Sequence, residues 1–126
     1  MAYKYEDLTH RIIEIFYKVY NTLGYGFLEK VYENALVIDC RKAGLDVKPQ
    51  APIQEHYDQE IVGEYFLDLL IENAVIVEIK AAKTLSKEHE AQLLNYLKAS
   101  GIEVGLLLNF GPKPEIKRKI FDNHRK

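Results

Sequence analysis

A chain of 126 residues, 48% hydrophobic and 29% charged, suits one domain with one core and leaves no room for a separate substrate-binding module. The formal net charge of −2 lacks the basic character typical of proteins that bind nucleic acid tightly on their own. Neither a signal peptide nor an apolar run of membrane-spanning length is recognisable, so we expect a cytoplasmic protein without a membrane partner. Cys40 is the only cysteine, which excludes an internal disulfide and a cysteine-built zinc site.

Two amphipathic helices are predicted at the start of the chain. Apolar residues recur at helical spacing from about residue 7 to 23, and Gly24 follows as a stop signal. A second helix is predicted over about 27–43. Glu29 borders its apolar stripe, three residues before Tyr32 on the same face, so we expect Glu29 to point toward the edge of the core.

Strand periodicity replaces helical periodicity from residue 47 to 82, where Gly63 is expected to mark the bend between the first strand and the second. The segment predicts a meander of three strands over roughly 48–57, 60–71 and 74–82.

The remaining elements predict a parallel crossover. Ser86 can cap a helix over 87–99, and the apolar run 104–108 predicts a strand buried on both faces. After two prolines, a short basic helix is predicted over about 114–121. The sequence therefore predicts one α/β domain over residues 1–126, with a mixed sheet of about four strands flanked by helices.

Three charged residues interrupt the apolar strands. Glu78 and Lys80 are two apart on one strand and share a face, and Asp68 lies on the strand before. Burying such groups costs free energy unless a partner charge compensates, and a divalent cation is the simplest partner. These residues indicate a metal-dependent phosphodiesterase centre.

The hairpin loop decides on which face Asp68 lies. A two-residue turn at Glu72-Asn73 would pair Asp68 with Val77, whereas a three-residue loop that includes Ala74 would pair it with Glu78. The metal site requires the second register. Asn73 tolerates the left-handed conformation that such a loop needs.

In that register Asp68 and Glu78 converge, and Glu29 could supply a third carboxylate. Oxygen ligands favour Mg²⁺ or Mn²⁺ over zinc, with the backbone carbonyl of Ile79 as an additional ligand. Lys80 would hold or help to deprotonate the attacking water and offset charge at the scissile phosphate.

The helix over 87–99 offers further candidates on one face. Gln92 and Tyr96 are i and i+4 neighbours, so Gln92 could orient the water or a phosphate oxygen and Tyr96 could contact the sugar-phosphate backbone. His89 lies one turn earlier, where an exposed polar residue is its ordinary role. The candidate substrate-binding residues are therefore Tyr32, His89 and Tyr96.

At this point the chain resembles a known family. Residues 26–32, Gly-Phe-Leu-Glu-Lys-Val-Tyr, resemble the signature of the GxxExxY proteins, which are similar to a small branch of the PD-(D/E)XK nuclease superfamily. The resemblance spans about residues 8–121 and implies a restriction-endonuclease-like αβββαβ core. It also implies that Asp68 and the Glu78-Ile79-Lys80 triplet carry the catalytic motif.

Two further motifs extend the resemblance. Gln92 and Tyr96 resemble the QxxxY motif of RecB-type nuclease domains, and Glu29 corresponds to an acidic residue on the early helix that assists metal binding in several branches. Leu67 stands where the superfamily name has proline. The resemblance thus implies DNA as substrate and Mg²⁺ or Mn²⁺ as cofactor.

Three functions remain open on the sequence. The first is a Mg²⁺-dependent nuclease acting on DNA. The second is a dimeric branched-DNA resolvase, because archaeal Holliday-junction resolvases are of similar size and share this core. The third is a non-catalytic nuclease-like module that binds nucleic acid or a protein partner.

Overall fold

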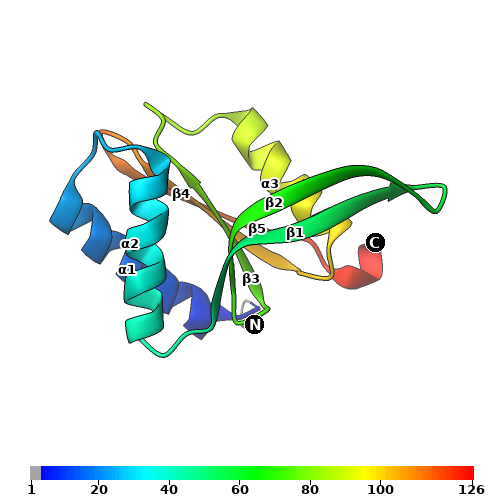
Figure 1. The fold of residues 1–126 in the computed structure, drawn as a ribbon, viewed down its shortest axis with the longest axis horizontal. Helices are drawn as coiled ribbons and strands as arrows, with labels where there is room; N and C mark the ends of the chain where they lie inside the picture. The colour runs from blue at the N-terminus through cyan, green and yellow to red at the C-terminus, as the bar shows by residue number, and fades with distance from the viewer. Residues whose placement is uncertain (1–3) are drawn as a thin grey trace.

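The sheet is built from three consecutive strands and two later ones, each paired with its neighbour in chain order (Figure 1). The computed structural model describes residues 4–126. Its elements are α1 (Glu6–Leu23), α2 (Glu29–Lys42), β1 (Val47–Tyr57), β2 (Glu60–Ile71), β3 (Val75–Lys80), α3 (Lys87–Ala99), β4 (Val104–Phe110), β5 (Pro114–Ile120) and a 3-10 helix (Asn123–Arg125). β3 and β4 run parallel, and all other pairs are antiparallel. The sheet is mixed, as predicted, but has five strands rather than about four.

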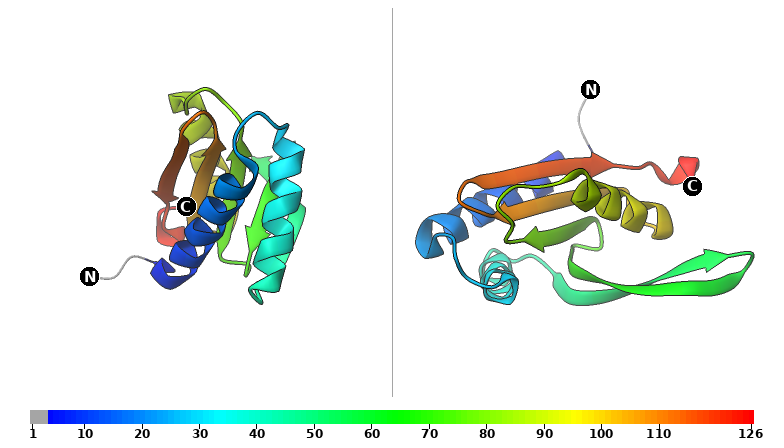
Figure 2. Two further views of the ribbon diagram at one scale, coloured as in Figure 1. Left: turned by 90° about the vertical axis from the view of Figure 1, so that its left-hand side faces the viewer. Right: turned by 90° about the horizontal axis from the view of Figure 1, so that it is seen from above.

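Helices cover both faces of the sheet (Figure 2). α1 and α2 pack on one face, where the ring of Tyr32 stacks on Phe110 of β4 with centroids 4.0 Å apart. α3 covers the other face through Leu93 and its neighbours. β3 lies between these layers and is buried up to Lys80, so charged side chains on it depend on partners within the fold.

Residues 114–120 form a strand, and the basic helix predicted over 114–121 is wrong. β5 pairs with β4 along its whole length, from Phe110↔Pro114 to Val104↔Ile120. Ile116 and Ile120 also pack against the core beneath α1 and α2. Pairing with a fully buried strand outweighs the weak helical preference of this lysine-rich segment.

The turn between β1 and β2 lies at Asp58-Gln59, where both residues are left-handed with φ of 51° and 67°. Two consecutive left-handed residues are typical of the type I′ turn that closes tight hairpins. Gly63, the predicted bend, instead pairs within β2 opposite Glu55, next to a register shift. The strand bounds were thus predicted better than the turn residue.

The β1–β2 hairpin changes face halfway along. Residues two apart on a strand normally share one face, yet Leu69 packs beneath α1 and α2 whereas Leu67 packs on the α3 side. The change occurs at Gln50, whose left-handed φ of 54° interrupts the ladder opposite Asp68. Beyond this kink, residues 51–67 extend from the body as an arm (Figures 1 and 2). Asp68 therefore lies where the arm joins the sheet.

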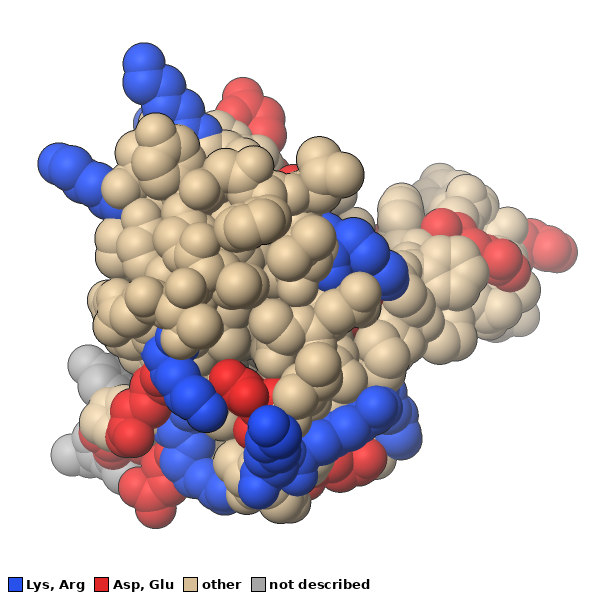
Figure 3. Space-filling model, turned by 60° about the vertical axis from the view of Figure 1, so that its left-hand side comes forward, with Lys and Arg blue, Asp and Glu red and all other residues tan. Residues whose placement is uncertain are grey.

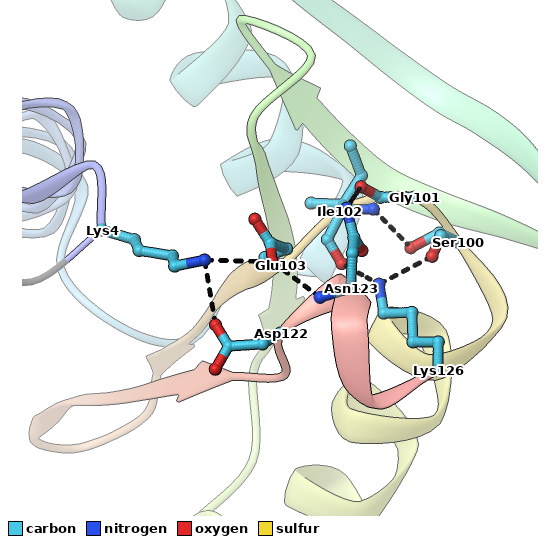
Figure 4. Close-up of polar contacts among 8 residues, drawn as sticks. All are labelled: Lys4, Ser100, Gly101, Ile102, Glu103, Asp122, Asn123 and Lys126. Carbon is cyan, nitrogen blue, oxygen red and sulfur yellow. Dashed lines mark hydrogen bonds and ion pairs between the residues drawn. The ribbon is translucent and has the colours of Figure 1, made fainter.

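A polar cluster fastens the last helix to the loop between α3 and β4 (Figure 4). The Lys4 ammonium pairs with Glu103 at 3.1 Å and with Asp122 at 3.0 Å. The Lys126 ammonium donates to the carbonyl oxygens of Ser100 and Ile102, both at 2.7 Å. These contacts lie near Val104, at the opposite end of β4 from the residues that pair with Glu78 and Lys80 of β3, and serve the fold rather than the candidate site.

Candidate active site

The register of the β2–β3 hairpin places Asp68 beside Glu78. The strands pair from Ile71↔Val75 to Leu69↔Val77, which leaves a three-residue loop over 72–74. Glu72 and Asn73 are both left-handed, with φ of 55° and 50°. The structure thus confirms the register that the proposed site requires, in which Asp68 faces Glu78 across the two strands.

The two carboxylates hold the backbones together where the ladder ends. The Asp68 amide donates to Oε2 of Glu78, and the Ile79 amide donates to Oδ2 of Asp68, both at 2.8 Å. Neither acid uses its second oxygen in a hydrogen bond within residues 4–126. No fully buried side-chain oxygen in this part of the chain lacks a partner, so these second oxygens reach solvent. Each acid therefore presents one uncommitted oxygen to the surface.

Both acids resist ionisation in the absence of a cation. Burial, followed by the nearby charge of Asp68, raises the pKa of Glu78 from 4.5 to about 8. Burial also raises the pKa of Asp68, partly opposed by the hydrogen bond from the Ile79 amide. Two carboxylates this close favour sharing a proton or a cation over ionising together. The pair suits a divalent cation, which prefers oxygen ligands.

Lys80 and Gln92 meet beside this pair. Lys80 shares a face with Glu78, and its ammonium donates to Oε1 of Gln92 on α3 at 3.3 Å. The positive charge of Lys80 lowers the pKa of both acids, although less than burial raises it. Gln92, a candidate from the sequence, therefore lies at the site through its contact with Lys80.

Tyr96 lies close to Asp68 and Glu78, whereas His89 has a structural role. The charges of Glu78 and Asp68, after burial, raise the pKa of the Tyr96 phenol. His89 caps α3: its amide donates to Ser86 Oγ at 3.2 Å, and its Nδ1 accepts from the Ser86 amide at 3.1 Å. This reciprocal capping uses His89 for helix stability.

Tyr32 is enclosed in the core. Its side chain is fully buried, and its hydroxyl donates to the Gly24 carbonyl at 2.6 Å and accepts from the Phe27 amide at 3.2 Å. These bonds fix the loop between α1 and α2. The structure thus places Tyr32 where a substrate does not reach it.

Sequence reasoning selected Glu29 on α2 and missed Glu33. Glu29 is exposed and makes no hydrogen bond within residues 4–126, whereas Glu33 is only 5% exposed. Oε2 of Glu33 accepts from Lys30 at 2.6 Å and Oε1 accepts from Gln50 at 3.0 Å. The charge of Glu33 raises the pKa of Asp68 more than the charge of Glu29 does. The sequence did offer a signal for Glu33, because this acid lies one helical turn beyond Glu29, within the stripe of α2 that becomes buried.

The predicted convergence of three carboxylates does not form. Among residues 4–126, no group of three or more acidic, histidine or cysteine side chains is arranged to hold a metal ion. Asp68 and Glu78 supply two carboxylates, and the remaining ligands would have to come from a backbone carbonyl, such as that of Ile79, and from water. Mg²⁺ commonly keeps several waters and binds through one or two carboxylates, so the donor set fits this ion.

A second network, also missed, fixes the loop that follows Lys80. The buried Asn109 side chain accepts from the Ala82 amide at 2.9 Å and donates to the Ala82 carbonyl at 3.0 Å. It donates as well to Glu115 at 2.9 Å, and Glu115 accepts from the Leu85 amide at 3.1 Å. β4 and β5 thereby hold residues 81–86 in place beside Lys80.

Comparison with known proteins identifies the superfamily. A family model described as the PD-(D/E)XK nuclease superfamily matches residues 6–119. Among solved structures, the crystal structure of SSO0001 is similar in fold, with a TM-score of 0.60 and 16% sequence identity. The match covers 74% of this chain and 50% of that one, so the chain spans about half the length of SSO0001. No curated protein matches significantly. Within residues 4–126, no helix combines the length and hydropathy needed to cross a membrane.

Proposed function

The chain belongs to the PD-(D/E)XK nuclease superfamily, and from that premise we propose that it is a Mg²⁺- or Mn²⁺-dependent nuclease that hydrolyses DNA phosphodiester bonds. The observation that carries the proposal is the pair of the half-buried Asp68 and the buried Glu78, each with one oxygen free, beside the Lys80 ammonium. In this proposal residues 1–126 act as one domain. The finer assignment to the GxxExxY group rests on residues 26–32 and belongs to the proposal as well.

Asp68, Glu78 and the carbonyl of Ile79 would hold the cation. When bound, such a cation lowers the pKa of water and offsets the negative charge of the scissile phosphate. The half-buried Asp68 and the buried Glu78 supply a favourable site for it because the nearby Lys80 offsets their charges only in part.

Lys80 and Gln92 would act on the nucleophile. Lys80 is half-buried and tethered to Gln92 at 3.3 Å, which keeps its ammonium on the same face as Glu78. From there Lys80 can orient the attacking water and stabilise charge that develops on the phosphate. Gln92 positions Lys80 and retains an amide nitrogen for a phosphate oxygen.

The charge distribution favours one approach for DNA. Acidic side chains stand out on the arm in Figure 3, and its residues include Glu55, Asp58, Glu60 and Glu64. These charges repel phosphates. Lys80, followed by Lys83 on the fixed loop, offers the attractive side, so the backbone of DNA should approach over the end of β3.

A nuclease assay with matched variants tests the proposal. Linear, nicked, single-stranded and branched DNA are incubated with Mg²⁺ or Mn²⁺, and with EDTA, for wild type, Asp68→Asn, Lys80→Ala and the control Lys42→Ala. Lys42 is exposed near the end of α2 and has no partner within residues 4–126. We expect metal-dependent cleavage by wild type and Lys42→Ala only. Equal cleavage by Lys80→Ala would show a contaminating enzyme and refute the assignment.

The substrate range separates the alternatives. Cleavage restricted to branched DNA by a dimer in solution would assign a resolvase. DNA binding without cleavage of any substrate would assign a non-catalytic module that works with nucleic acid or a protein partner.

A further inference from the structure

A pocket of about 410 Å³ opens beside the proposed catalytic residues, between the base of the arm and α3. It is lined by Tyr65, Glu88, Ala91, Gln92, Asn95 and Tyr96. Gln92 belongs both to this pocket and to the contact with Lys80. The pocket is therefore continuous with the site at which a scissile phosphate would lie.

The lining combines aromatic rings with uncommitted polar groups. Tyr65 on the arm and Tyr96 on α3 contact each other, with centroids 5.5 Å apart and planes inclined by 47°. Tyr65 is 40% exposed, so part of its ring remains available. Within residues 4–126, neither phenol hydroxyl nor the side chains of Glu88 and Asn95 make a hydrogen bond to the protein. The pocket can thus stack a planar group and bond to its edge.

The charge of the lining argues against a phosphate. No lysine or arginine lines the pocket, and Glu88 contributes a carboxylate. A phosphate would meet repulsion here, whereas the exocyclic amino group of a nucleobase can donate to that carboxylate. The amides of Gln92 and Asn95 add donors and acceptors of the kind that bind base edges.

We propose that this pocket binds one unpaired nucleobase next to the scissile phosphate, so that the chain acts on a flap, frayed end or single-stranded segment rather than on continuous duplex. The identification of the scissile position rests on the proposed nuclease function. A base within a duplex is stacked and paired and cannot enter, whereas an unpaired base can stack on an aromatic side chain and expose its edge. Adenine, cytosine and guanine, which carry exocyclic amino groups, should be preferred over thymine because of Glu88.

Binding of 2-aminopurine DNA tests the pocket without requiring cleavage. The base is placed in a short flap next to a duplex, or in the same duplex without a flap, and fluorescence is titrated in Ca²⁺ in place of Mg²⁺. Wild type should bind the flap more tightly and change its fluorescence. Tyr65→Ala and Asn95→Ala should weaken flap binding, Tyr65→Ala by roughly tenfold, while Tyr65→Phe retains it. Tyr57→Ala, which removes a 75% exposed tyrosine near the tip of the arm, is the matched control and should bind as wild type does.

The outcomes separate this proposal from the nuclease assignment. Equal affinity for flap and duplex, or equal flap binding by Tyr65→Ala and Tyr57→Ala, overturns the pocket even if Mg²⁺-dependent cleavage of duplex DNA is found. Loss of flap binding and of the fluorescence change in Tyr65→Ala, with weaker flap binding by Asn95→Ala and wild-type binding by Tyr57→Ala, supports the pocket even if no substrate is cleaved. A loss that is the same on flap and duplex indicates a backbone contact and overturns the proposal.

Discussion

Replacing Glu78 with glutamine should stabilise the metal-free protein at alkaline pH. The Glu78 side chain is only 4% exposed, and burial together with the charge of Asp68 raises its pKa from 4.5 to about 8. An amide cannot ionise, so Glu78→Gln removes the cost of a buried charge. Its oxygen can still accept from the Asp68 amide, which donates to Glu78 at 2.8 Å.

The pH window follows from the two protonation states. Below pH 4.5 the carboxyl is protonated in both the folded and the unfolded chain, and its contribution to stability is fully present. Between pH 4.5 and about 8 the folded chain keeps a proton that the unfolded chain has released, so stability falls as pH rises. At about 1.4 kcal/mol for each pH unit, the loss amounts to about 4–5 kcal/mol once the pH exceeds 8.

Urea unfolding in EDTA at pH 5, 7 and 9 measures this loss. The free energy of unfolding of Glu78→Gln, relative to wild type, should increase by several kcal/mol from pH 5 to pH 9. Glu14→Gln, which changes an exposed acid on α1, should follow wild type at every pH. Parallel pH profiles for wild type and Glu78→Gln would refute the argument, as would lower stability of Glu78→Gln at pH 9.

Three further predictions concern the metal and the surrounding fold. Mn²⁺ at 100 times its dissociation constant should stabilise wild type by about 2.7 kcal/mol, and thermal melts of Asp68→Asn should show no such shift. Asn109→Ala leaves the Ala82 amide and carbonyl without their side-chain partners. The variant should lose about 1–3 kcal/mol of unfolding free energy in urea and cleave more slowly, because the loop beside Lys80 loosens. Unchanged stability would contradict this prediction. Phe110→Ala removes the ring between Phe16 and Tyr32 and should cost about 3–5 kcal/mol, whereas a loss below 1 kcal/mol would contradict the described core.

Local patterns predicted the elements well where one strong periodicity acted alone. The helix over 87–99 was confirmed to the residue, since Ser86 supplies a side-chain cap and Leu93 and Leu97 follow helical spacing. The prediction for residues 114–120 was wrong because the lysines there suggested the end of a helix. The segment is a strand because it pairs with β4, and local propensity does not reveal that pairing.

The site was predictable in part for a similar reason. Strand parity placed Glu78 and Lys80 on one face, and the turn residues limited Asp68 to two registers, of which the structure has the three-residue loop. Glu33 was missed because its environment depends on the kink at Gln50. Glutamine rarely adopts a left-handed conformation, so no local rule predicts that kink or the proximity of α2 to Asp68.

A crystal soaked in Mn²⁺, and measured for anomalous scattering, tests the metal assignment most directly. The proposal predicts an anomalous peak between the free oxygens of Asp68 and Glu78, next to the carbonyl of Ile79, and no peak there in Asp68→Asn crystals soaked in the same way. Mn²⁺ bound only elsewhere, with the Lys80 ammonium inserted between the two carboxylates, would contradict the proposed metal centre.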